Sequence, residues 1–153
     1  MAEPRGGVSS KTLLDGSVSV DGPRGSARLS RLQPGSLLFV CSGALSADFY
    51  APMSKIAQHE VDLQGRLMMA VDGWELASVD TGFREQWTEW FQSHKQRFRM
   101  RLLLRTKLME MAASLANLFT GMTVITTYSS IKAWERGVAE DVRGFRRPAV
   151  PGA

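Results

Sequence analysis

The feature that most constrains the fold is an alternation, after residue 46, of amphipathic helical segments with short apolar runs. Apolar residues at helical spacing predict a helix over 47–60, with Ser46 or Asp48 as its N-cap. The run 66–72 is apolar almost throughout, as expected of a strand that is buried on both faces. We predict that a loop over 73–82 leads from this strand into a second helix.

The second helix is indicated by large side chains that recur along one helical face: Phe83, Trp87, Trp90, Phe91 and His94. The stretch 97–105 begins with the alternation of a strand and ends as a buried strand. Thr106 can cap a third helix, whose expected inner face is Leu108, Met111, Ala112, Leu115 and Leu118. Gly121 is expected to end this third helix.

The alternation continues with a β-branched strand over 123–128 and a last helix that Ser129 or Ser130 caps. The inner face of that helix is expected to hold Ile131, Trp134 and Val138. Before residue 46, weakly alternating segments at 17–22 and 27–32 and the apolar run 37–41 predict two or three strands, with a turn over 33–36.

Strands joined through helices imply parallel pairing with right-handed crossovers. We therefore predict an α/β fold: a mixed, largely parallel sheet of four or five strands with about four helices. A chain of 153 residues suits one domain, which we place at 17–143, between a flexible leader at 1–16 and a flexible tail at 144–153.

The positive net charge of +4 is local. Residues 95–107 hold six cations and no acid, which leaves 13 cations against 15 acids in the rest of the chain. A cationic segment of this kind attracts an acidic protein, nucleic acid or an anionic lipid surface, and the charge alone does not choose among them.

Several classes of protein are disfavoured by the composition. The longest apolar stretches, 37–41 among them, are far shorter than the ~20 residues that span a bilayer, and the N-terminus lacks the apolar segment of a signal peptide. We therefore expect a cytoplasmic protein. Cys41, His59 and His94 offer no zinc-ligand spacing, so neither a metal nor another cofactor is expected.

Three segments resemble the SpoIIAA-like group of the STAS (sulfate transporter and anti-sigma-factor antagonist) domains. They are residues 45–50 at the start of the first helix, the buried strand 67–71, and the run 114–120 (Ser-Leu-Ala-Asn-Leu-Phe-Thr), which a strand and a helix follow. The resemblance spans about 27–140. It implies a sheet with helices on it and a bacterial regulatory protein, similar to an anti-sigma-factor antagonist, that docks on a protein partner such as a kinase.

The same resemblance directs attention to the start of the second helix. Antagonists of this group carry a phosphorylated serine in an Asp-Ser-x-Gly type of turn, and the corresponding segment here, 77–82, is one residue shorter before its glycine. Ser78 and Thr81 are thus the phosphoacceptor candidates, with Asp80 beside them. The alternative is that Asp80 or Thr81 only caps the helix.

Two further features are candidates for partner binding. Arg97, Arg99 and Arg101 alternate with apolar residues, so their guanidinium groups should share one sheet face and suit phosphates or carboxylates. The alternative is a solvated row that keeps the protein soluble. Trp74 falls in the predicted loop, where it is either an exposed partner anchor or is folded back on the core.

No pairing of a general base with a nucleophile is recognisable, and Cys41 in its apolar run is expected to be an inert core residue. We therefore expect no enzyme. The sequence favours a non-catalytic regulatory module that presents residues 73–84 to a protein partner, with nucleic acid as a less favoured partner. The alternative is a carrier that holds a small lipid or a nucleotide between sheet and helices.

Overall fold

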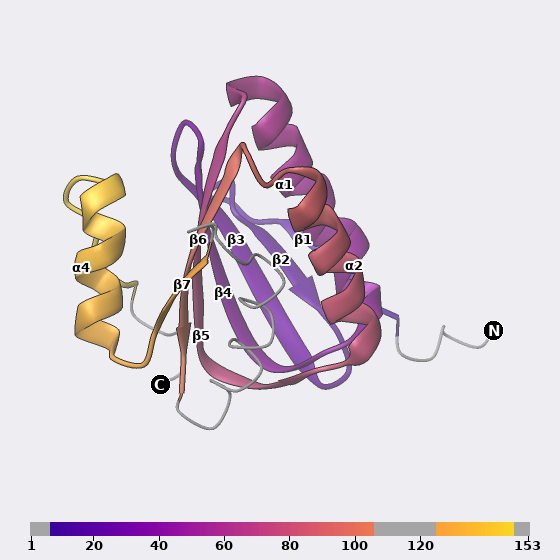
Figure 1. Cartoon of the computed structure of the whole chain (residues 1–153). Helices are drawn as coiled ribbons and strands as arrows, with labels where there is room; N and C mark the ends of the chain where they lie inside the picture. Colours follow the sequence, from indigo (N-terminus) through magenta and orange to yellow (C-terminus); the bar gives the residue numbers. More distant parts are fainter. Residues whose placement is uncertain (1–6, 106–124, 149–153) are drawn as a thin grey trace.

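The computed structural model describes residues 7–105 and 125–148, which form one mixed sheet with helices on both faces (Figure 1). The strands lie in the sheet in the order in which they occur in the chain. They are β1 (Ser9–Thr12), β2 (Val18–Asp21), β3 (Gly25–Gln33), β4 (Ser36–Leu45), β5 (Leu67–Val79), β6 (Phe98–Leu104) and β7 (Ile125–Tyr128). The pairings from β1 to β4 are antiparallel, and those from β4 to β7 are parallel.

Helices cover the two faces unequally (Figure 1). The 3-10 turn η1 (Ala47–Phe49), α1 (Tyr50–Gln64) and α2 (Thr81–Ser93) lie on one face, and α4 (Ile131–Asp141) lies on the other. Within the described residues, no helix has the length and apolar character needed to cross a membrane.

The alternation of side chains along β5 divides the interior into two cores. Leu67, Met69 and Val71 belong to the core under α1 and α2, whereas Met68 and Ala70 belong to the core under α4. Because successive strand residues point to opposite faces, a central strand that is covered on both sides must be apolar at every position. This requirement accounts for the continuous apolar run that the sequence shows.

The predicted fold class is confirmed as a mixed α/β sheet, although the described residues form seven strands and three of the six pairings between them are parallel. The first helix is also confirmed and runs on to Gln64, where Gly65 ends it at a φ of 76°. That left-handed conformation favours glycine. The third helix predicted after Thr106, and the 114–120 run, lie outside the described residues.

The predicted loop over 73–82 is wrong, because β5 continues to Val79 and pairs with β4 as far as Leu45. Gly73 suggested a loop, but it lies inside β5, where the absence of a side chain allows β6 to approach closely. A Cβ there would lie 2.8 Å from the carbonyl oxygen of Leu103. Glycine inside a strand often marks such an approach of neighbouring backbone.

Parts of the predicted leader at 1–16 and of the predicted tail at 144–153 take part in the fold. Residues 9–12 form the edge strand β1, paired with β2. Near the other end, Phe145 is buried against Trp134, with ring centroids 5.5 Å apart, and Arg147 forms an ion pair with Asp72. These long-range contacts are invisible to a prediction that relies on local composition.

Candidate functional site

An apolar pocket of about 560 Å³ lies between the sheet and α2. Strands β4, β5 and β6 form its floor, α2 forms its opposite wall, and Met53 of α1 contributes to one side. The apolar lining is Phe39, Cys41, Met53, Met69, Val71, Leu76, Val79, Phe83, Trp87, Phe91, Met100, Leu102 and Leu104. Ligand pockets commonly enclose about 300–1,000 Å³ with mostly apolar walls, so this cavity has the size and character of a binding site.

Trp87 is the centre of the aromatic cluster that forms the α2 wall. Its ring lies 5.2 Å from Tyr50 in an edge-on arrangement and 5.3 Å from Phe91 in a stacked one. Phe39 on the sheet completes the contact at 6.2 Å. Such pairs fix ring positions beyond what area burial alone provides, so this wall is rigid.

The floor and the α1 side, in contrast, contain adaptable side chains. Met53, Met69 and Met100 all line the pocket. Methionine is unbranched and polarisable, and it repacks around ligands of differing shape. The pocket therefore combines one rigid aromatic wall with a compliant surface.

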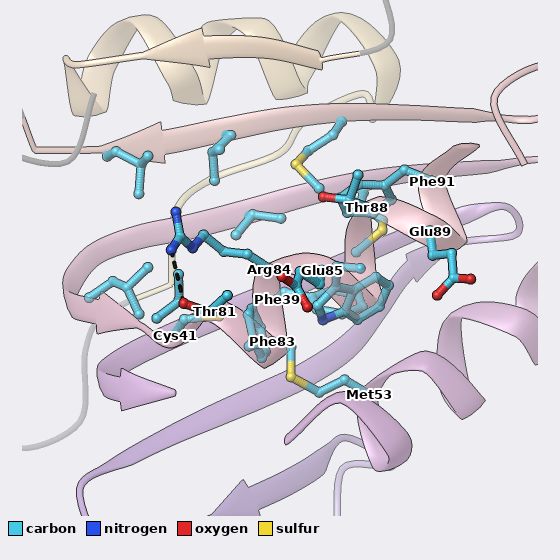
Figure 2. A pocket seen from close by; sticks show the side chains of 18 of the residues that line it. Phe39, Cys41, Met53, Thr81, Phe83, Arg84, Glu85, Thr88, Glu89 and Phe91 are labelled. Atoms are coloured by element: carbon cyan, nitrogen blue, oxygen red, sulfur yellow. Dashed lines mark hydrogen bonds between the residues drawn. The ribbon is translucent and has the colours of Figure 1, made fainter. Parts of the chain in front are cut away.

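Polar side chains of α2 form the rim of the pocket, and they include Thr81, Arg84, Glu85 and Glu89 (Figure 2). The Arg84 guanidinium donates a hydrogen bond of 3.4 Å to the Thr81 hydroxyl. Arg84 is exposed and forms no ion pair within the described part of the chain. Its charge is thus available to an anionic group at the rim.

Asp80 fixes the position of this rim. One carboxylate oxygen accepts a 2.7 Å hydrogen bond from the backbone N–H of Phe83, and the other accepts a 3.1 Å bond from that of Ala47. The predicted capping of α2 by Asp80 is confirmed. Ser46 takes the predicted N-cap position, at the start of η1, but its side chain makes no capping bond. The carboxylate of Asp80, which follows β5, accepts the hydrogen bond from the Ala47 N–H instead.

Cys41 lies on the pocket floor without the properties of a nucleophile. Burial, and secondarily the nearby carboxylate of Asp72, raise the pKa of its thiol to about 12. The thiolate is therefore scarce at neutral pH, and reactivity depends on the thiolate.

Comparison with known structures identifies the fold. The chain is similar to the crystal structure of an uncharacterized protein of the DUF3478 family from Shewanella loihica PV-4, which is described as having a SpoIIAA-like fold. The two share 16% sequence identity over 93% of this chain and 98% of the other, with a TM-score of 0.56. The chain has a SpoIIAA-like fold. No protein-family model matches it, and no curated protein matches it in sequence.

In this SpoIIAA-like fold the two phosphoacceptor candidates lie near one another but differ in setting. Thr81 is the first residue of α2, is exposed, and lines the pocket rim. Ser78 is exposed near the end of β5 and does not line the pocket. Of the two candidates, only Thr81 lies at the cavity.

Trp74 lies in strand β5 and is not the loop residue that we predicted. It is half-buried beside the α4 core, and the Arg105 guanidinium lies 5.0 Å from the centre of its ring. Arg105 also donates a 2.8 Å hydrogen bond to the Trp74 carbonyl. The alternative in which this tryptophan is folded back on the core is closer to the observed structure.

The arginine row is divided by its surroundings. Arg99 and Arg101 point to the α4 face, where each forms a 2.6 Å ion pair with Asp141. Burial opposes the charge of Arg101, but its bonds to Asp141 and Tyr128 outweigh that effect and raise the pKa of the guanidinium. Arg97 lies in the turn before β6 and is exposed. The three arginines therefore do not form one free surface.

The sequence raised a carrier pocket between sheet and helices only as an alternative, and it did not single out Arg84 or Met53 as lining residues. The aromatic face of α2 was correctly assigned to the interior, but a helical pattern does not reveal that the interior is incompletely filled. The one available signal for Arg84 was its position one turn after Thr81, on the rim side of the same helix.

Proposed function

We propose that this protein is a non-catalytic binding module that holds an apolar molecule with an anionic head group in the pocket between the sheet and α2. The single observation that supports this most strongly is the 560 Å³ cavity with apolar walls. Burying apolar surface in such a cavity contributes roughly 25 cal/mol for each Å² removed from water.

The head group is inferred from the rim. Arg84 is the one cation among the described residues that line the pocket, and it has no acidic partner there. A carboxylate or phosphate at the mouth could accept charge-assisted hydrogen bonds from Arg84 while the apolar portion occupies the cavity. Fatty acids and related amphiphiles have this chemistry.

The absence of catalysis is part of the proposal. The described pocket lining contains no histidine, and its cysteine has a pKa of about 12. An acid–base mechanism requires a positioned group whose pKa lies near the working pH. The rim carboxylates of Glu85 and Glu89 have no nucleophile paired with them by a hydrogen bond among the described contacts.

The experiment is native mass spectrometry of the purified protein, followed by titration with decanoate and with decanol while the intrinsic tryptophan fluorescence, to which Trp87 in the pocket wall contributes, is monitored. We expect a bound amphiphile, and a higher affinity for the carboxylate than for the alcohol. Arg84→Gln should abolish the difference between the two probes, whereas Arg136→Gln, an exposed-helix control on α4, should preserve it.

A matched pair of variants tests whether the cavity is the site. Met100→Phe places a larger side chain on the pocket floor, and Met68→Phe makes the same change on the opposite face of the sheet. Circular dichroism should confirm that both variants fold. Only Met100→Phe should lose probe binding. The proposal is contradicted if both variants lose binding, if neither does, or if the parent protein does not bind the probe.

A second candidate function, docking on a protein partner under control of phosphorylation, is favoured by one observation. Thr81 is exposed at the N-terminus of α2, directly after the Asp80 cap. A phosphate there adds negative charge beside the Asp80 carboxylate, so repulsion should loosen the junction of β5, η1 and α2. Ser78, two residues before Asp80, is the alternative acceptor.

The docking function is tested by affinity purification followed by mass spectrometry that reports partners and phosphosites together. Thr81→Glu should change the set of captured proteins, and Ser78→Glu serves as the comparison. If Thr81→Glu and Trp74→Ala both retain every partner of the parent protein, this second function is contradicted.

A further inference from the structure

A second cleft, of about 790 Å³, lies where the parallel strands begin. Its lining includes Ser36, Leu67 and Phe98, which are the first residues of β4, β5 and β6, together with the C-terminal end of α4. This cleft shares no lining residue with the apolar pocket among those described. We therefore treat it as an independent site.

Four cations line this cleft: Arg66, Lys95, Arg97 and Arg99. Arg66, Lys95 and Arg97 are exposed, and within the described part of the chain their side chains form neither an ion pair nor a hydrogen bond. The acids that line the cleft are Glu140 and Asp141, and both already pair with Arg101 or Arg99. The cleft thus has an excess of uncompensated positive charge.

The register of the sheet brings these cations together. Leu67 pairs with Phe98, so Arg66 and Arg97, which precede them, lie at the same edge. A 2.7 Å hydrogen bond from the Leu67 N–H to the Arg97 carbonyl holds the two chain segments side by side. Like charges on neighbouring strands repel, and an anion bound between them would relieve that repulsion.

The chemistry of the lining narrows the choice of ligand. Arginine is suited to phosphate because its planar guanidinium donates two parallel hydrogen bonds. Single-stranded nucleic acid also needs exposed aromatic rings on which bases stack. Phe98 is the aromatic residue among the described lining of the cleft, and it is only 2% exposed.

We propose that this cleft binds a small soluble ligand that carries two or more linked phosphate groups. Arg66 and Arg97 would hold adjacent phosphates, with Lys95 as a third positive charge. This site goes beyond the amphiphile site proposed above and depends on none of its residues.

The experiment is isothermal titration calorimetry of the full-length protein with orthophosphate, pyrophosphate and tripolyphosphate at low ionic strength. Affinity should rise with the number of linked phosphates and fall as salt is added, because screening weakens exposed charges. Arg66→Gln and Arg97→Gln should each weaken tripolyphosphate binding by about tenfold, the loss of one charge-assisted hydrogen bond.

Arg24→Gln is the matched control, since Arg24 is an exposed cation in the turn between β2 and β3, outside the cleft. It makes the same change in net charge and should alter affinity by less than about twofold. All three positions are exposed, so thermal melting should show unchanged folding.

Three results would overturn the proposal. The first is failure of the parent protein to bind tripolyphosphate. In the second, Arg24→Gln weakens binding as much as Arg66→Gln and Arg97→Gln do, which would mean that net charge alone is responsible. In the third, a short single-stranded DNA binds more tightly than tripolyphosphate and loses affinity in the two cleft variants, which would identify a nucleic-acid surface.

Discussion

The Asp80 carboxylate accepts a 3.1 Å hydrogen bond from the backbone N–H of Ala47, 33 residues earlier in the chain. Its other oxygen accepts a bond from Phe83, so one side chain caps both η1 and α2. Because the first N–H groups of a helix have no partner within the helix, a shared cap couples the two segments. The rim of the apolar pocket is built on this coupling.

Asp80→Ala should therefore lower the free energy of unfolding by about 1 to 2 kcal/mol, as expected for the loss of a helix cap with two acceptors. Asp80→Asn should cost less, because an amide oxygen can still accept one of the two bonds. Urea denaturation followed by circular dichroism measures both. Asp62→Ala, an exposed control on α1, should change stability by less than about 0.5 kcal/mol.

Removing only one member of the buried ion pair between Asp72 and Arg147 should lower the free energy of unfolding considerably. The two groups lie 2.6 Å apart, and the Asp72 side chain is 2% exposed. Arg147→Met leaves a buried carboxylate without its partner, and such losses cost about 3 kcal/mol or more. The double variant with Asp72→Asn should recover part of that loss. Urea denaturation of the two single variants and the double variant measures these changes in the free energy of unfolding. If the changes in the single variants simply add up in the double variant, Asp72 and Arg147 are not coupled.

Replacing Gly137 of α4 with alanine should destabilise the protein, although this change normally stabilises a helix. A Cβ at this position would lie 2.8 Å from Cζ of Tyr128 and 3.0 Å from Nη1 of Arg101. Gly137→Ala should therefore destabilise the protein by about 1 to 3 kcal/mol through overpacking, in contrast to the usual gain for glycine to alanine in a helix. Thermal unfolding measures the effect. In a Tyr128→Phe background, where the hydroxyl is absent, the penalty should be smaller.

The Cys41 thiol should make stability depend on pH in the alkaline range. Its pKa is raised from 9.0 to about 12 in the folded protein. The unfolded chain releases this proton first, so the stabilisation is complete below pH 9 and is lost as pH rises from 9 towards 12. The slope attributable to one such group is at most about 1.4 kcal/mol per pH unit.

Comparing urea denaturation of the parent protein and Cys41→Ala at pH 8.5 and 10.5 isolates this effect from the titration of other groups. The parent should lose more stability over this interval than the variant does. The folded parent should also react slowly with a thiol reagent at pH 8 and rapidly in urea. Equal loss of stability in the two proteins would show that the thiol is not protected by burial.

The fold class and most elements could be predicted from the sequence, because they depend on local periodicity. The apolar run that became β5 and the face of Phe83, Trp87 and Phe91 on α2 could be recognised from spacing alone, since burial repeats at the period of each element. The capping roles of Asp80 and Ser130 could also be predicted, because a cap acts on N–H groups two or three residues away.

The tertiary structure alone decided which residues form the sites. Arg66 and Arg97 meet because β5 and β6 pair in parallel, and Asp72 is matched to Arg147 across 75 residues. In the sequence Arg101 has no evident partner, but in the structure it forms an ion pair with Asp141 of α4. Trp74 was predicted to lie in a loop because Gly73 precedes it, but it lies in β5. Pairing register, unfilled volume and long-range charge compensation depend on how the elements pack, and a local pattern carries no information about them.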